Sequence, residues 1–298
     1  MISFVKLNAA GNDFVLVDGR EGLPEPPEEL ARRLCTRRLS LGADGLLVVE
    51  ETGELPPLGV AHYEPDGERT FCLNGLRGAA AWLVATGQHP PGEALVLRSD
   101  AGDLDAIPGR AEVSVALPQP RSLERRSVLL EDGLLVLGCF VDVGNPQFVV
   151  VLGEPSELEA PDLMDRAREL RWAVDSFPGG TNVTFAAPDP AREDRWYVRT
   201  YERGVEDETL SCGSGVFAAA CALVGCPYPE AVLLSAPSPA GASLGRSSAA
   251  ASRPSALRLH FACRSGEEQV VTFPEGPNSQ RVWSRGPVQL VAGGQLWP

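Results

Sequence analysis

The sequence predicts an α/β protein of the α+β type, with mostly antiparallel sheet and two similar halves. Short apolar strands alternate with only a few helices, a pattern that is typical of antiparallel sheets. The stretch around Cys72 also returns about 140 positions later, around Cys212, and in each copy a glycine-rich turn opens an apolar helix. With 298 residues, the chain is long enough to form two domains, one around each copy.

The first predicted domain, residues 1–118, carries Cys72. Its first two strands are joined by a turn of small and Asx residues, and its second helix ends at Gly87. The segment Pro118-Gln119-Pro120 marks the crossing into the second half. In chain order we expect strands at 2–7 and 14–18, a helix at about 28–38, strands at 46–49 and 60–63, a helix at about 74–86, and strands at 94–97 and 111–115.

The second predicted domain, residues 119–279, carries Cys212 and repeats this plan. Residues 235–256 are almost wholly Ser, Ala, Pro and Gly, a composition that buries too little apolar surface to offset the entropy of ordering, so we expect a mobile loop or hairpin extension there. The last strand is expected to return to the first half, so that about 280–298 completes it. In chain order we expect strands at 134–137, 148–151, 183–185 and 196–201, helices at about 162–170 and 214–224, and strands at 257–261, 269–273 and 288–291.

The composition narrows the classes of protein and of site. A net charge of −14 argues against a surface for nucleic acid or for an anionic membrane. No export signal or membrane-length apolar run is present, so we expect a cytoplasmic protein. Seven cysteines in such a chain are not expected to form a disulfide framework, and the three histidines have no metal-ligand spacing. No metal site is therefore predicted.

Two of the seven cysteines differ from the others by their repeated surroundings. A lone cysteine is usually a small core residue, which is the role expected of Cys35, Cys139, Cys221, Cys226 and Cys263. Cys72 and Cys212 instead stand at turns that open helices, where unpaired N–H groups and the helix dipole should lower the pKa of a thiol and hold a carboxylate. If both sulfurs flank one carbon, one can take a proton while the other gives one.

Motifs along nearly the whole chain carry a resemblance to the diaminopimelate epimerase family, and they occur in that family's order. They are Gly11-Asn12-Asp13-Phe14, Gly42-Ala43-Asp44-Gly45-Leu46, Asp66-Gly67, Cys72-x-Asn74-Gly75-x-Arg77, Gly144-Asn145-Pro146, Asn182-Val183-x-Phe185, Glu202-Arg203-Gly204 and Glu208-Thr209-Leu210-x-Cys212-Gly213-Ser214-Gly215. Any one of these motifs is weak evidence for the family by itself, but the complete set in this order is specific to it.

The resemblance implies two pseudo-symmetric halves, each a curled, mostly antiparallel sheet around a central helix, with the active site in the cleft between them. It implies an isomerase that interconverts LL- and meso-diaminopimelate without a cofactor, and a homodimer. Cys72 and Cys212 would be the catalytic acid–base pair. The small-molecule substrate would be held by Asn12, Asn74, Asn145, Asn182, Glu202 and Arg203, with backbone N–H groups of Leu73, Asn74, Gly213 and Ser214 on its carboxylate. Glu64, which departs from the family pattern, is a further candidate for contact with the substrate.

Four positions depart from the family pattern. Leu73 and Gly78 replace a glycine and a cysteine of the first cysteine motif, and a leucine is costly at position 73 if the turn requires a positive φ. Glu64 replaces an asparagine, and its carboxylate would favour a cationic or differently sized distal group on the substrate. Gln147 replaces a histidine, which would deprive Cys72 of a titratable neighbour.

These departures leave other hypotheses open. The first is a racemase or epimerase of another amino acid that uses the same two cysteines. A non-catalytic amino-acid binder and a redox protein with a functional disulfide belong to different classes. A serine hydrolase is disfavoured, because no histidine accompanies Ser214 in a hydrolase motif. A nucleotide-binding loop is also disfavoured, because neither glycine-rich turn has the Lys-Ser/Thr ending of such a loop.

Overall fold

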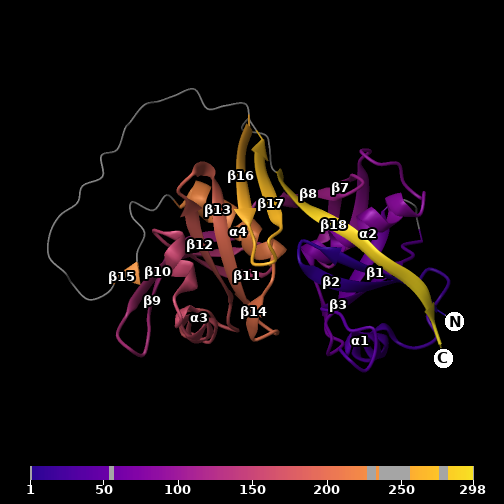
Figure 1. The fold of residues 1–298 in the computed structure, drawn as a ribbon, viewed down its shortest axis with the longest axis horizontal. Coiled ribbons are helices and arrows are strands. Elements are labelled where there is room, and N and C mark those ends of the chain that lie inside the picture. The colour runs from indigo at the N-terminus through magenta and orange to yellow at the C-terminus, as the bar shows by residue number, and fades with distance from the viewer. Residues whose placement is uncertain (1, 54–56, 227–232, 235–255, 275–280, 298) are drawn as a thin grey trace.

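The structure is a computed structural model that describes residues 2–53, 57–226, 233–234, 256–274 and 281–297. Two lobes lie side by side, with both chain ends at the first lobe (Figure 1). The first lobe contains β1 (Ile2–Ala9), β2 (Asn12–Asp18), α1 (Pro27–Cys35), β3 (Gly45–Glu50), β4 (Leu58–Tyr63), β5 (Arg69–Thr70), α2 (Leu73–Ala85), β6 (Leu95–Ser99), β7 (Gly102–Pro108) and β8 (Glu112–Pro118).

The other elements begin with β9 (Ser122–Leu129), β10 (Leu135–Asp142) and β11 (Pro146–Val151). A 3₁₀ helix, η1 (Pro155–Glu159), and α3 (Leu163–Arg171) follow. The chain then continues through β12 (Asn182–Asp189), β13 (Arg192–Glu202), β14 (Asp207–Thr209), α4 (Gly213–Gly225), β15 (Leu233–Leu234), β16 (Ala256–Ala262), β17 (Glu268–Pro274) and β18 (Arg281–Leu296).

The strand pairings repeat from one half to the other. In the first half β2 pairs parallel with β3 and β4 parallel with β6; in the second half β11 pairs parallel with β12 and β13 parallel with β16. The other pairings in both halves are antiparallel among the described residues, for example β1 with β2 and β10 with β11. The predicted α+β class with pseudo-symmetric, mostly antiparallel halves is therefore confirmed.

The last strand joins the two halves. The first part of β18 pairs with β8, Arg281 opposite Pro118, and with β17 of the second half. Its second part pairs with β1, so that Ile2 lies opposite Leu296. In Figure 1 this strand crosses the first lobe from the junction of the lobes to the C-terminus. The chain ends are thus held by ladder hydrogen bonds to the first half.

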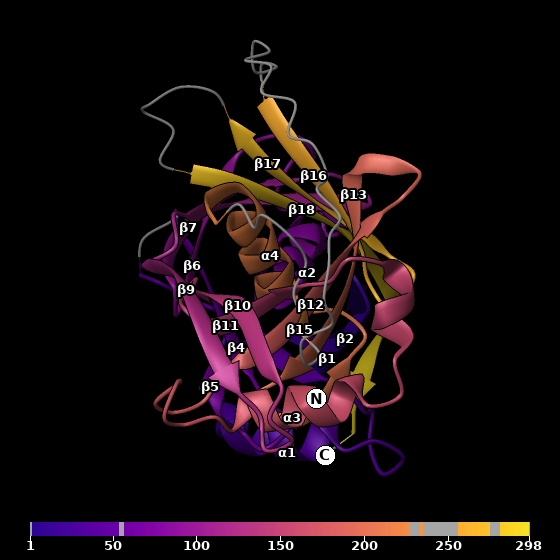
Figure 2. The same ribbon diagram turned by 90° about the vertical axis from the view of Figure 1, so that its left-hand side faces the viewer.

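A helix that is buried on most of its surface occupies the centre of each half. Both α2 and α4 have 13 residues and are built largely of Ala, Leu, Val and Gly. Because such a helix has no polar face for solvent, it is stable only when it is enclosed. Figure 2 shows both helices within the surrounding strands, and their apolar side chains belong to one continuous core cluster that includes residues of both halves.

The first helix ends at Cys35 rather than near Arg38, because Thr36 already has an extended backbone with ψ 109°. Arg38 then adopts a left-handed conformation with φ 71°, and Arg37 binds Asp13 and Asp44. The segment 235–256, expected to be mobile, lies outside the described residues except for Ala256, which begins β16. No helix among the described residues is both long and apolar enough to cross a membrane.

Candidate active site

Cys72 and Cys212 occupy equivalent positions in the two halves. Each is the N-cap residue of a central helix, with φ −129° and ψ 112° at Cys72 and φ −124° and ψ 108° at Cys212. Each sulfur accepts a hydrogen bond from the backbone N–H three residues on, Gly75 at 3.4 Å and Gly215 at 3.3 Å. The repeated sequence therefore builds the same thiol cap twice.

The two caps meet where the halves join. A Cβ atom on Gly213 would lie 2.9 Å from Asn74 Oδ1 and 3.3 Å from Leu73 Cβ, so the turn after Cys212 packs directly on the turn after Cys72. The two sulfurs are also close enough for a charge on Cys72 to raise the pKa of the Cys212 thiol. Cys72 is half-buried and Cys212 is 6% exposed.

The pKa of both thiols departs from the expected direction. Burial raises the pKa of Cys72 to about 12, and burial with the nearby Glu202 carboxylate raises the pKa of Cys212. The N–H groups of the caps act in the opposite direction, as expected, but the loss of hydration outweighs them. The expectation of a lowered thiol pKa is therefore wrong for the protein in this arrangement.

Two carboxylates from different halves lie near the sulfurs. Glu64 follows β4, and its Oε1 accepts a hydrogen bond from Thr70 Oγ1 at 2.9 Å. Glu202 ends β13, and it is hydrogen-bonded by Thr209 and by the Cys212 thiol. Burial raises the pKa of both groups, to about 7 at Glu64, where the charge of Glu202 adds to the effect. Both charges also raise the pKa of Cys72.

A buried chain of hydrogen bonds connects the two cysteine turns. Asn74 Nδ2 donates to Asn12 Oδ1 at 2.8 Å, and Asn74 Oδ1 accepts from Arg77 Nη1 at 2.5 Å. The same Nη1 donates to Gln269 Oε1 at 2.7 Å, and Gln269 Nε2 donates to Ser211 Oγ at 2.8 Å. Ser211 directly precedes Cys212 in the sequence, so the chain spans both halves.

Arg77 is the central member of this chain. It is fully buried, and its remaining donors are Nη2, which binds Ser284 Oγ at 2.6 Å, and Nε, which has no hydrogen-bond partner. No carboxylate pairs with it in the described part of the chain. Burial lowers the pKa of Arg77 to about 10, and Cys72 is one of two thiols whose charge would oppose that shift. In the sequence Arg77 is only one residue of the Cys72 motif, and nothing there indicates that its side chain reaches the other half.

The other predicted substrate residues lie on loops and strand ends of the second half. Asn182 is buried, accepts from the N–H of Arg203 at 2.7 Å and donates to the Pro146 carbonyl at 3.2 Å. The guanidinium of Arg203 is exposed and forms no ion pair with a described residue; Nη1 lies 3.4 Å from the Gly179 carbonyl. Asn145 is half-buried and follows Gly144, which has φ 91°.

Two of the departures from the family pattern are explained by their positions. Leu73 begins α2, has no positive φ and is 3% exposed, so a leucine is accommodated there without backbone strain. Gln147 lies beside Cys212 rather than Cys72, which corrects the expectation for this residue. Its Nε2 donates to Ser214 Oγ at 3.0 Å and lies 3.9 Å from the Cys212 sulfur, while Ser214 Oγ is 3.4 Å from the same sulfur.

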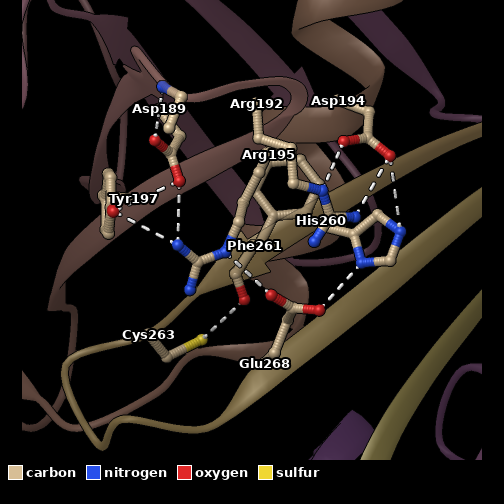
Figure 3. Close-up of polar contacts among 10 residues, drawn as sticks. Asp189, Arg192, Asp194, Arg195, Tyr197, His260, Phe261, Cys263 and Glu268 are labelled. Carbon is tan, nitrogen blue, oxygen red and sulfur yellow. Dashed lines mark hydrogen bonds and ion pairs between the residues drawn. The ribbon is translucent and has the colours of Figure 1, made fainter.

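Two cavities among the described residues do not include Cys212 in their walls. One of about 200 Å³ lies on the sheet formed by β8, β16, β17 and β18, next to the polar cluster of Figure 3. In that cluster Arg195 donates to Glu268 at 2.9 Å and His260 lies 2.8 Å from the same carboxylate, so it ties β13 to the hairpin of β16 and β17. A cavity of only about 10 Å³, enough for about one water, touches Cys72.

Comparison with known proteins identifies relatives by sequence and by fold. A family model described as diaminopimelate epimerase matches residues 139–235. The diaminopimelate epimerase of Chlorobaculum tepidum is 35% identical over 222 residues, covering 72% of this chain and 80% of that protein. That of Aquifex aeolicus is 33% identical over 235 residues, covering 75% and 81%.

Solved structures with low sequence identity share the fold. A PhzF-family phenazine biosynthesis protein of Bacillus anthracis superposes with a TM-score of 0.70 at 14% identity, covering 100% of this chain and 99% of that one. A hydroxyproline epimerase of Agrobacterium vitis, solved with trans-4-hydroxy-L-proline bound, gives a TM-score of 0.67 at 15% identity, covering 99% and 90%.

Proposed function

Because this chain belongs to the diaminopimelate epimerase family and is an isomerase, we propose that it interconverts LL- and meso-diaminopimelate with Cys72 and Cys212 as the acid–base pair. The observation that supports this assignment most is the pair of equivalent cysteine caps, one from each half, close enough for their charges to interact. In the proposed reaction one thiolate removes the α-proton from one face and the other thiol protonates the opposite face. The two sulfurs exchange roles in the reverse direction, and no cofactor takes part.

The α-carboxylate would be held by the first N–H groups of the two helices. Those of Leu73 and Asn74 belong to α2, and those of Gly213 and Ser214 belong to α4. The first N–H groups of a helix have no partner within it, and they lie at the positive end of its dipole. Such preorganised donors stabilise the negative charge that spreads onto the carboxylate when the α-proton leaves.

The substrate's ammonium group would lower the cost of forming a thiolate. Glu64 and Glu202 both raise the pKa of Cys72 through their charges. An ammonium bound between these carboxylates would cancel much of that effect, so the base would form when substrate is present. Arg203, which has no described ion-pair partner, would bind the distal carboxylate, with Asn12, Asn145 and Asn182 as further hydrogen-bonding groups.

The turns after the two cysteines pack against each other, so the halves would separate to admit the substrate.

We place the boundary of the halves near residue 118, with 1–118 completed by about 280–298, and 119–279 as the second half. We further propose that the protein is cytoplasmic and acts as a homodimer on a small-molecule amino acid, without nucleic acid or a membrane as partner.

Hydrogen exchange at the α-carbon tests the reaction. Diaminopimelate is incubated with the protein in deuterated water, and both deuterium incorporation and the LL-to-meso ratio are followed. Cys72→Ser and Cys212→Ser should each reduce turnover by at least about 1,000-fold, because serine is a far weaker base than a thiolate. Cys221→Ser, a buried cysteine of α4 away from the cap, is the matched control and should keep most of the activity.

A second candidate is a racemase or epimerase of another amino acid with the same two cysteines. Glu64 favours it, since a half-buried carboxylate beside the site suits a substrate whose distal group is cationic. The same exchange experiment on a panel of amino acids separates the two candidates. If the α-hydrogen of lysine or ornithine exchanges and that of diaminopimelate does not, the protein is a racemase or epimerase of another amino acid rather than a diaminopimelate epimerase. If both cysteine variants bind amino acids and function as before, the protein is a binder rather than an enzyme.

A further inference from the structure

We propose that Cys139 and Cys226 are an oxidisable pair that a peroxide converts into a disulfide, which ties the end of α4 to β10. The two sulfurs lie 2.9 Å apart, and both residues are buried, at 0% and 5% exposure. They are 87 positions apart in the sequence, so tertiary packing brings them together. Neither residue has a role in the proposed isomerisation.

The backbone on each side holds the pair in place. Cys139 lies in the middle of β10, opposite Arg125 of β9 and Val149 of β11. Cys226 is the C-cap residue of α4, and its N–H donates to the Ala222 carbonyl at 2.8 Å. A disulfide bond is about 2.05 Å long, so the sulfurs must approach by less than about 1 Å.

The pair is separated from the proposed catalytic thiols by the length of a helix. Cys212 caps the first end of α4 and Cys226 caps the last, with 13 helical residues between them, or about 20 Å. A disulfide between Cys139 and Cys226 therefore does not involve the sulfur of Cys212. This differs from a disulfide between Cys72 and Cys212, which would remove both proposed catalytic groups.

The oxidation balances with one peroxide per pair. The thiolate of one cysteine attacks a peroxide oxygen, the O–O bond breaks, and a sulfenic acid and one water form. The second sulfur then attacks the sulfenic sulfur, the S–O bond breaks, and a second water leaves with the remaining proton. Two electrons pass from the thiols to the peroxide. Cys226 is the first sulfur expected to react, because it is the more exposed of the two.

Mass spectrometry of the folded protein tests the pair directly. The experiment uses a Cys72→Ser, Cys212→Ser double variant, which lacks the two proposed catalytic thiols. The variant protein is treated with hydrogen peroxide, alkylated with iodoacetamide and digested. We expect one disulfide-linked peptide pair containing Cys139 and Cys226, with the other three cysteines alkylated. Because the bond closes a long loop, the melting temperature should rise by roughly 5–10 °C and return when a reductant is added.

Single substitutions provide the controls. Cys226→Ala should abolish both the linked peptide and the change in melting temperature, whereas Cys221→Ala on the same helix should leave both unchanged. Alkylation of Cys139 and Cys226 after peroxide treatment would overturn the proposal, as would linkage of either to another cysteine, or conversion to sulfinic acid without a link. None of these readouts uses enzymatic activity, so they are independent of the proposed function.

Discussion

Glu64 shows how one side chain can set the reactivity of its neighbour. Its carboxyl group is largely shielded from solvent, and burial raises its pKa to about 7. Near and above that pH it carries a negative charge that raises the pKa of the Cys72 thiol. The departure from the family pattern therefore affects the proposed base itself, in addition to any effect on the choice of substrate.

Glu64→Gln should make Cys72 more reactive in the absence of substrate. Removing a nearby negative charge lowers the pKa of the thiol, so the thiolate fraction at pH 8 should increase by roughly three- to tenfold. The rate of Cys72 alkylation by iodoacetamide, followed by peptide mapping, measures this change. Glu68→Gln is the matched control, since Glu68 is exposed and is not among the charges that raise the Cys72 pKa. Equal rates in the two variants would show that Glu64 does not act on the sulfur.

At the scale of elements, the site depends on the contact between the first turns of α2 and α4. Each helix begins directly after its cysteine, and the glycine that follows Cys212 lets the other turn approach closely. A side chain at position 213 would meet Asn74 Oδ1 at 2.9 Å, tighter than ordinary van der Waals contact. The spacing of the two sulfurs is therefore set partly by the absence of one Cβ atom.

Gly213→Ala should reduce activity more than stability. The added methyl would move the two turns apart by a few tenths of an ångström or displace Asn74, and small misplacements of reacting groups cost roughly 10- to 100-fold in rate. Alanine is a better helix former than glycine, so the free energy of unfolding should change by less than about 1 kcal/mol. Turnover and urea denaturation measure the two effects. Gly87→Ala, in open space, would be strained by its φ of 72° and would lower stability without affecting turnover.

At the scale of the whole molecule, Arg77 is the residue that joins the halves. Its guanidinium reaches from α2 to Gln269 of β17 and Ser284 of β18, and Gln269 continues to Ser211 beside Cys212. Burying a cation with only neutral partners is costly, so a nearby anion would relieve that cost. The thiolate of Cys72 is such an anion, because its charge raises the pKa of Arg77.

Arg77→Met should therefore lose activity through charge as well as position. We expect a decrease in turnover of roughly 100-fold and a shift of Cys72 alkylation to higher pH, because a nearby cation that stabilises the thiolate is gone. Arg77→Lys, which keeps the charge, should restore part of both. Ser284→Ala removes one hydrogen bond and no charge, so it should leave the alkylation profile unchanged. An unchanged profile in Arg77→Met would mean that Arg77 only holds the halves together.

The local structure could be predicted from the sequence because each element depends on a few neighbouring residues. The glycine turns and the apolar runs after Cys72 and Cys212 predict helices at about 74–86 and 214–224, and the structure has them at Leu73–Ala85 and Gly213–Gly225. The end of α1 could not be predicted, because it depends on Arg37 binding Asp13 and Asp44 from other segments. The direction of the thiol pKa was also wrong, since burial is a property of packing.

The sequence by itself therefore determined the two similar halves, the elements that form them and the pair of cysteine caps. Each of these depends on a few neighbouring residues or on a repeat that is visible in the chain. Only the tertiary structure decided that Glu64 and Glu202 converge on the sulfurs, that Gln147 lies beside Cys212, and that Arg77 crosses to the second half. These contacts join residues far apart in the chain, and which of them form depends on how the two halves pack.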